Sequence, residues 1–162
     1  MNHLIVILDR KGGVAKKGYM PWNIPEDQDF FTRMTKTLGG HVLSGGVTYR
    51  NAYGGKPLVD RHNYILTHDP TPIEGAVVVN DLKSFLDDFN EELWVSGGSV
   101  VFEEIFKLDK ADVLYITHVD ADFGCDQFFP EYKDDYDLVE ESERREQNGF
   151  YFTYARYTKK ST

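Results

Sequence analysis

An aspartate at the start of a predicted helix is the residue of this chain best placed to do chemistry. Pro25 suits the first helical position, where its missing N–H removes no hydrogen bond. Counting from Asp27, the positions i+3, i+4, i+7 and i+11 lie on one stripe of a helix, and all four are apolar: Phe30, Phe31, Met34 and Leu38. A carboxylate on an apolar stripe must be paired, face a cleft or shift its pKa.

Two interpretations of Asp27 compete. A carboxylate in the first turn of a helix complements the macrodipole and the free N–H groups there, which is a purely structural role. Glu26 and Asp29 can fill that role from more solvent-facing positions, so Asp27 is not needed for it. Trp22 and the Phe30-Phe31 pair flank the acid. They indicate a flat apolar slot, which suits a planar heterocycle with adjacent N–H donors.

Glycine pairs follow two predicted strands and open two predicted helices. They are Gly45-Gly46 and Gly97-Gly98. Glycine lets the backbone approach a ligand closely, and a helix start offers free N–H groups to phosphate, so two such pairs suit a dinucleotide. Glycines that merely turn the chain are the competing explanation for either pair, and neither matches a GxGxxG or Walker motif. A third pair, Gly12-Gly13, stands with Gly18 in a long loop and indicates a mobile flap that closes over a site.

The elements that must position these residues alternate along the chain. Short, nearly continuous apolar runs predict strands at 3–8, 41–43, 63–67, 76–79 and 93–96. Helices are predicted between them at 25–38, 47–52, 82–89 and 99–106. This alternation predicts an α/β fold with a mostly parallel central sheet and helices on both faces.

The last third of the chain changes character. A strand is predicted at 113–119, and residues 136–145 and 150–158 alternate in period two. Asn148-Gly149 between the last two is a strong hairpin signal. We therefore expect an antiparallel strand at one edge of the sheet. In such sheets the ligand lies beyond the carboxyl ends of the parallel strands.

Length and composition narrow the class of protein. A chain of 162 residues, 41% of them hydrophobic, predicts one domain over residues 1–162. The net charge of −9 argues against a nucleic acid as partner, and no apolar run is long enough to predict a membrane span. The single cysteine, Cys125, fits a reducing cytoplasm. We expect a monomer, and no metal site, because the five histidines are scattered.

Taken together, these segments resemble a dihydrofolate reductase over nearly the full length. The matching segments are 20–27, 45–49, 58–63, 95–99, 115–120 and 126–130. The resemblance implies a single-domain fold of that family. It also implies reduction of 7,8-dihydrofolate to 5,6,7,8-tetrahydrofolate by hydride from NADPH, in one-carbon metabolism.

The resemblance assigns the substrate end of the site residue by residue. Asp27 is implied to hold N3 and the 2-amino group of the pterin, with Thr117 supporting its carboxylate and Trp22 holding an ordered water. Arg61 is implied to bind the α-carboxylate of the glutamate tail, for which the planar guanidinium is well suited. The other implied substrate contacts are Ile5, Val6, Gln28, Phe31, Leu58 and Ser96. Ser96 stands where a larger aliphatic residue is usual, which opens room.

Hydride reduction of a C=N bond also needs a proton at N5 of the pterin. In the usual binding pose Asp27 lies too far along the ring to protonate N5 itself. We therefore expect Asp27 to orient the pterin and to stabilise its protonated form, with water as the proximate donor.

The cofactor end departs most from the family pattern. The implied cofactor contacts are Ile7, Val14, Ala15, Met20, Gly45, Gly46, Val47, Thr48, Thr67, His68, Gly97, Gly98, Ser99, Val100 and Phe102. Family members usually have arginine at the position of Gly46, where it contacts the 2′-phosphate of NADPH, and a basic residue is common at the position of Val100. Thr67 and His68 can still hydrogen-bond the phosphate, and Arg50 and Lys36 are further candidates. NADPH is expected, and NADH stays open.

Two alternatives to this function stay open at the sequence level. One is a reductase of the same fold that acts on a pyrimidine of the riboflavin pathway, although that reading predicts no Pro-Trp-Asn-x-Pro-x-Asp run. The other is a non-catalytic folate-binding or nucleotide-binding module, which the weakened phosphate site suggests.

Overall fold

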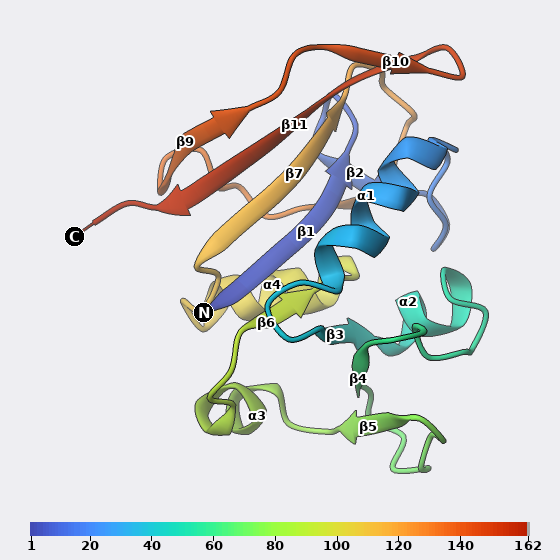
Figure 1. Cartoon of the computed structure of the whole chain (residues 1–162), viewed down its shortest axis with the longest axis vertical. Coiled ribbons are helices and arrows are strands. Elements are labelled where there is room, and N and C mark those ends of the chain that lie inside the picture. Colours follow the sequence, from blue (N-terminus) through green and yellow to red (C-terminus); the bar gives the residue numbers. More distant parts are fainter. Residues whose placement is uncertain (162) are drawn as a thin grey trace.

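A single twisted mixed sheet organises the computed structural model, which describes residues 1–161 (Figure 1). Its strands are β1 (Asn2–Leu8), β3 (His41–Gly45), β4 (His62–Leu66), β5 (Ala76–Val79), β6 (Leu93–Val95), β7 (Val113–Val119), β9 (Tyr136–Glu141), β10 (Arg145–Gln147) and β11 (Phe150–Lys159). The order is β10-β11-β7-β1-β6-β3-β4-β5, with β9 also paired to β11. The final residue of the predicted domain, Thr162, lies outside the described residues.

Strand directions confirm the predicted sheet. The strands from β7 to β5 in this order are all parallel, and β11 runs antiparallel to β7. The predicted strand at 136–145 is divided in two, however, and both parts, β9 and β10, lie outside β11. At the break the Ser142 hydroxyl accepts the N–H of Tyr154, at 2.9 Å. A side chain thus takes a backbone donor that a continuous ladder would have used.

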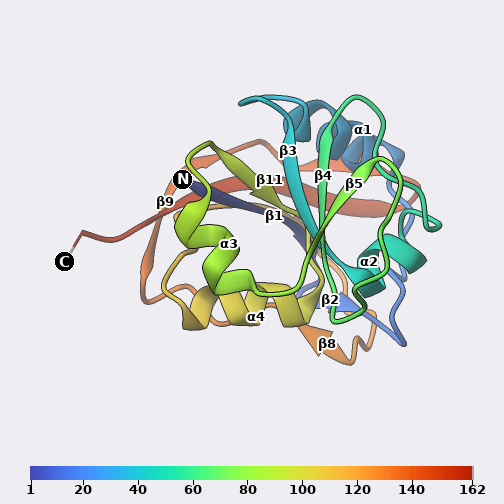
Figure 2. The same ribbon diagram turned by 90° about the horizontal axis from the view of Figure 1, so that it is seen from below.

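Helices cover both faces of the sheet, as predicted. They are α1 (Pro25–Thr35), α2 (Gly46–Asn51), α3 (Leu82–Asp88) and α4 (Ser99–Lys107). Leu4 and Leu8 of β1 pack in one core cluster with residues of α3 and α4, whereas Ile5 packs on the other face with Phe31 of α1. Seen from below, α1 and α4 lie on opposite sides of β1 and β11 (Figure 2). The period-two alternation of β1 therefore serves two cores.

The first helix is shorter than its sequence pattern predicts. It ends at Thr35, and Leu38, the last residue of the predicted stripe, is 47% exposed with φ = 56°. Gly39 and Gly40 also have positive φ. A run of left-handed residues cannot continue a right-handed helix, so the stripe ends at Met34.

A small second sheet fixes the base of the flap. The sequence predicts the flap but not this sheet. Strands β2 (Gly13–Ala15) and β8 (Gln127–Phe128) pair there. A Cβ on Gly13 would lie 2.4 Å from that of Cys125. The buried Asp9 carboxylate accepts the Gly13 N–H at 2.7 Å; burial opposes its charge, but its backbone donors prevail and lower its pKa. Motion of the flap itself stays a prediction.

The hairpin at the end of the chain follows its sequence signal. Gln147 pairs with Phe150, and both turn residues, Asn148 and Gly149, have positive φ, at 54° and 81°. A type I′ turn requires that conformation, so the prediction is confirmed. Within residues 1–161, no helix has the length and apolar character that crossing a membrane requires.

Candidate active site

A cleft of about 850 Å³ opens where the central parallel strands end. Its walls come from β1, from the ends of β3 and β4, from the segment after β6, and from α1, α2 and the start of α4. The flap residues Val14, Ala15 and Met20 also line it. Of the residues assigned to the site from the sequence, all but Arg61 and Gly97 line this cleft.

Asp27 is the acid at the α1 side of the cleft, and its hydrogen-bond partner in the protein is Thr117 of β7. The Thr117 hydroxyl donates to Oδ1 of Asp27 at 2.7 Å. Burial raises the Asp27 pKa to about 6, against the lowering effect of the Thr117 hydrogen bond, and the negative charge of Glu26 raises it further. Within residues 1–161 no donor contacts Oδ2, so the carboxylate retains acceptor capacity for a ligand.

Apolar and aromatic side chains surround this carboxylate. Ile5, Phe31 and Leu58 form one lining wall and belong to the core cluster under α1. Trp22 is 8% exposed and packs against Phe123, with ring centroids 5.3 Å apart. The slot is therefore largely apolar around one ionisable group, which suits a flat heterocycle with polar edges.

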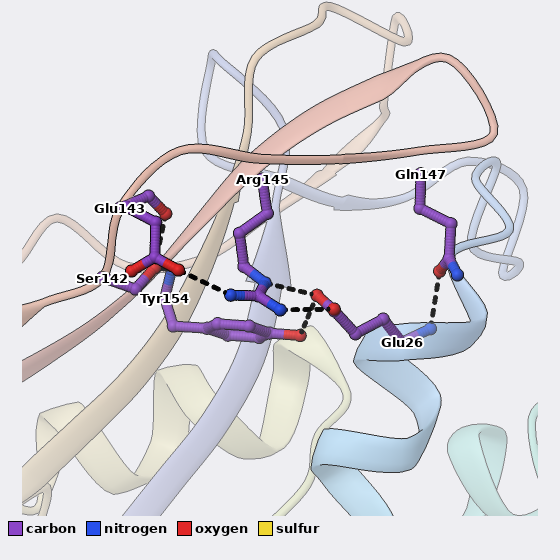
Figure 3. A network of polar contacts seen from close by, with 6 residues as sticks. All are labelled: Glu26, Ser142, Glu143, Arg145, Gln147 and Tyr154. Carbon is purple, nitrogen blue, oxygen red and sulfur yellow. Dashed lines mark hydrogen bonds and ion pairs between the residues drawn. The ribbon is translucent and has the colours of Figure 1, made fainter.

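A polar network from the C-terminal hairpin holds the start of α1 (Figure 3). Arg145 donates from Nε and Nη2 to the two Glu26 oxygens, each at 2.8 Å, and the Tyr154 hydroxyl donates to Glu26 at 3.3 Å. The Gln147 side-chain oxygen accepts the Glu26 N–H at 2.7 Å. No side chain caps α1 from the residue before it, so Gln147 fills that role from across the fold. The residue before Asp27 is thus fixed by the hairpin.

A chain of three hydroxyls in the cleft was not predicted as a unit. The Tyr53 hydroxyl lies 2.7 Å from that of Ser96, which lies 2.7 Å from that of Ser44. The room expected beside Ser96 is therefore occupied by Tyr53. Tyr53 lies in the loop after α2, where no periodic pattern points to it.

Arg61 does not line the cleft. Its Nη1 donates to the Thr35 hydroxyl at 3.0 Å and its Nε donates to the Val59 carbonyl at 2.9 Å. Burial lowers its pKa, against the opposing effects of Tyr53 and Asp60. Within the described residues Nη2 makes no hydrogen bond.

The two glycine pairs meet each other across β3 and the segment after β6. The Gly45 N–H donates to the Gly97 carbonyl at 2.6 Å, and the Gly97–Gly98 peptide is cis. A Cβ on Gly45 would lie 2.8 Å from Val101, and one on Gly98 would lie 3.2 Å from the Thr48 hydroxyl. Gly97 lies behind the lining at φ = 114°, against the ring of Phe102. Side chains at these positions would press on the residues packed around them, and Gly45, Gly46 and Gly98 form a glycine cradle whose backbone lines the cleft.

The glycine cradle fits a phosphate-bearing dinucleotide. It leads into α4, whose first turn has no side-chain cap. Free N–H groups at a helix start suit phosphate. Ser99, Val100 and Phe102 of α4 line the cleft beside the cradle, as do Thr48 and Val47 of α2.

Comparison with known proteins agrees with this geometry. The sequence model of the family "Dihydrofolate reductase" matches residues 1–159. The chain is 31% identical to the dihydrofolate reductase of Aedes albopictus, over 96% of each chain. It is 30% identical to that of Bacillus subtilis (strain 168), over 100% of this chain and 96% of the relative. A structure of dihydrofolate reductase from Enterococcus faecalis, complexed with NADP(H) and RAB-propyl, superposes with a TM-score of 0.85 at 29% identity, covering 99% of this chain and 97% of that one.

Removing the Gln147 side chain tests the link between the hairpin and α1. Q147A leaves the Glu26 N–H without its cap, so we expect the free energy of unfolding to fall by about 1 kcal/mol. Denaturation in urea measures it. The control is E131A, on an exposed residue whose side chain makes no hydrogen bond or ion pair within residues 1–161, with an expected change below about 0.5 kcal/mol. Equal effects of the two substitutions would contradict the capping role.

Proposed function

The chain belongs to the dihydrofolate reductase family, and we propose that Asp27 is the side chain on which its NADPH-dependent reduction of 7,8-dihydrofolate to 5,6,7,8-tetrahydrofolate depends. The observation that carries this proposal is a carboxylate recessed in an apolar cleft, with one oxygen held by Thr117. The pterin presents adjacent N–H donors at N3 and the 2-amino group. An ionised carboxylate can accept from both, which fixes the ring in one orientation.

The walls of the cleft support the same assignment. Ile5, Phe31 and Leu58 offer apolar surface to the pterin and the benzoyl group, which excludes water from the faces of the rings. NADPH supplies the hydride when it is bound. Gly45 and Gly98 would hold it, since their backbone lines the cleft without a side chain, and the Gly97 carbonyl would support them by accepting the Gly45 N–H.

Asp27 assists the protonation of N5 of the pterin indirectly. The site must favour a pterin protonated at N5, and a negative charge held nearby in an apolar slot stabilises that cation. A water held by Trp22 is the proximate donor, because the Asp27 carboxylate is engaged at the opposite edge of the ring. Thr117 keeps the carboxylate oriented while the substrate enters and leaves.

Arg61 is proposed to bind the α-carboxylate of the glutamate tail just outside the cleft. Two of its nitrogens are engaged by Thr35 and Val59, which hold the guanidinium in place. The Nη2 donors, which make no hydrogen bond within the described residues, are those proposed for the tail as it passes Leu58.

The setting of the enzyme is also proposed. We infer that residues 1–162 act as one domain, as a monomer in the cytoplasm. One continuous sheet supports the first statement, and the single unpaired Cys125 fits a reducing compartment. Light scattering of the purified protein tests the monomer.

Replacing the acid by its amide tests its role in turnover. D27N keeps the size of the side chain but removes the charge, so we expect kcat at pH 7 to fall by about 10²–10³-fold. The assay follows the absorbance of reduced nicotinamide with dihydrofolate. D29N, an exposed aspartate of the same helix, is the control and keeps kcat within about twofold. Near-normal turnover in D27N would contradict the proposed role of Asp27.

The same variant should be more stable than the parent at high pH. The Asp27 pKa is raised from 3.8 to about 6, so burial destabilises the ionised form. The resulting contribution to stability is present below about pH 4 and lost as the pH rises through about 6. We expect the free energy of unfolding of D27N to exceed that of the parent by about 1–3 kcal/mol at pH 8 and not to exceed it at pH 4. Urea denaturation at both pH values measures this, and a parent more stable at pH 8 would contradict it.

A further inference from the structure

The cleft contains one permanent cation. Among its lining residues Arg50 is the only lysine or arginine, whereas two acids, Asp27 and Glu104, line it. The whole chain carries a net charge of −9. NADPH is a polyanion, so Arg50 is the one charged side chain of the lining that attracts it.

Gly46 provides the space that the Arg50 side chain occupies. Arg50 lies in the last turn of α2, four residues after Gly46, so the two share one face of the helix. Helical side chains point back toward the N-terminus, and Nη1 of Arg50 lies 3.0 Å from where a Cβ of Gly46 would be. Within residues 1–161 no carboxylate lies within 4.0 Å of this guanidinium. The guanidinium of Arg50 therefore lies, without an acidic partner, in space that a side chain at position 46 would take.

Neighbouring donors surround the same point. The Thr67 hydroxyl lies 3.7 Å from the Gly46 Cβ position. It accepts the Asp69 N–H at 3.1 Å, which leaves its own hydrogen free to donate. The Asn80 amide donates to the Thr67 carbonyl at 2.6 Å and keeps a second hydrogen. Arg50, Thr67 and Asn80 all line the cleft.

The order of strands in the sheet indicates which part of the cofactor lies near Arg50 and Thr67. Hydride must be delivered beside the pterin, and therefore near Asp27 and Thr117 of β7. Thr67 follows β4, which lies four strand spacings from β7, or roughly 19 Å. The glycine cradle at β3 and β6 lies between them and suits the pyrophosphate. The adenosine end, which bears the 2′-phosphate, then reaches β4.

We propose that Arg50 binds the 2′-phosphate of NADPH, with the Thr67 hydroxyl beside it, and that this contact sets the preference for NADPH over NADH. The inference rests on the proposed function of the cleft and adds a specificity-determining residue to it. Lys36, the other candidate from the sequence, does not line the cleft and lies 3.8 Å from Asp60. A guanidinium displaced by one helical turn thus takes the place of the arginine that the family resemblance led us to expect at position 46.

Binding of each cofactor without substrate tests this contact. The dissociation constants of NADPH and NADH are measured by quenching of tryptophan fluorescence in the parent, in R50Q and in K107Q. We expect R50Q to weaken NADPH binding by about 10–100-fold and NADH binding by less than about twofold. K107Q removes the same charge from an exposed site on α4, so its two constants should stay near those of the parent. As a competitor, 2′,5′-ADP should lose affinity in R50Q, and 5′-ADP should not.

Two results would overturn the proposal: an unchanged NADPH constant in R50Q, or an equal loss for both cofactors, which would place Arg50 on a shared part of the molecule. R50M, which keeps the aliphatic stem, repeats the test if R50Q is unstable to heat. Reduction of dihydrofolate with saturating NADH should persist in R50Q. Failure of the Arg50 contact is therefore distinguishable from failure of the proposed reaction, which would abolish turnover in the parent with both cofactors.

Discussion

The hydrogen bond from Thr117 to Asp27 is the interaction on which the rest of this site depends. It joins the first turn of α1 to the central strand β7 and holds a carboxylate at the bottom of an apolar cleft. Burial opposes the charge there, and the raised pKa of about 6 reflects that conflict. One donor from the protein limits the penalty without removing it. We propose that the substrate uses the remaining acceptor capacity through its own N–H groups.

Several distant segments serve to keep that carboxylate in place. Gln147 and Arg145 of the C-terminal hairpin hold Glu26, the residue before Asp27. Tyr154 of β11 stacks on Phe30 of α1 with ring centroids 4.3 Å apart. The hairpin therefore positions the helix, and the helix positions the acid. The charge of Asp27 lowers the stability of the fold but serves binding, and such trade-offs between stability and activity are common at functional sites.

The residues that could be predicted from the sequence are those whose role follows from local spacing. The helical stripe placed Asp27 with Phe30, Phe31 and Met34, because a period of 3.6 is a property of a few adjacent turns. Short apolar runs likewise predicted the parallel strands, and Asn148-Gly149 predicted the hairpin. Leu38 was placed wrongly, since the helix ends at Thr35 and Leu38 itself begins a run of residues with positive φ.

What could not be predicted depends on which segments the fold brings together. Glu26 was interpreted as a dipole partner, but its ion pair is with Arg145, 119 residues away. Tyr53 reaches Ser96 from the loop after α2. Arg61 and Gly97 were assigned to the cleft and do not line it. Each of these contacts depends on the order of strands in the sheet and on side-chain direction, and neither is encoded in residue spacing.

NMR titration of the Asp27 carboxyl carbon tests whether this residue is a buried acid that the substrate ionises. The protein is labelled with carbon-13 aspartate, and D27N assigns the signal. We expect an apparent pKa of about 6 in the free protein. We also expect a lower pKa when folate is bound, because the N–H donors of the pterin favour the ionised form. A free carboxyl that titrates near 3.8, or one whose pKa is unchanged by folate, would contradict this role of Asp27.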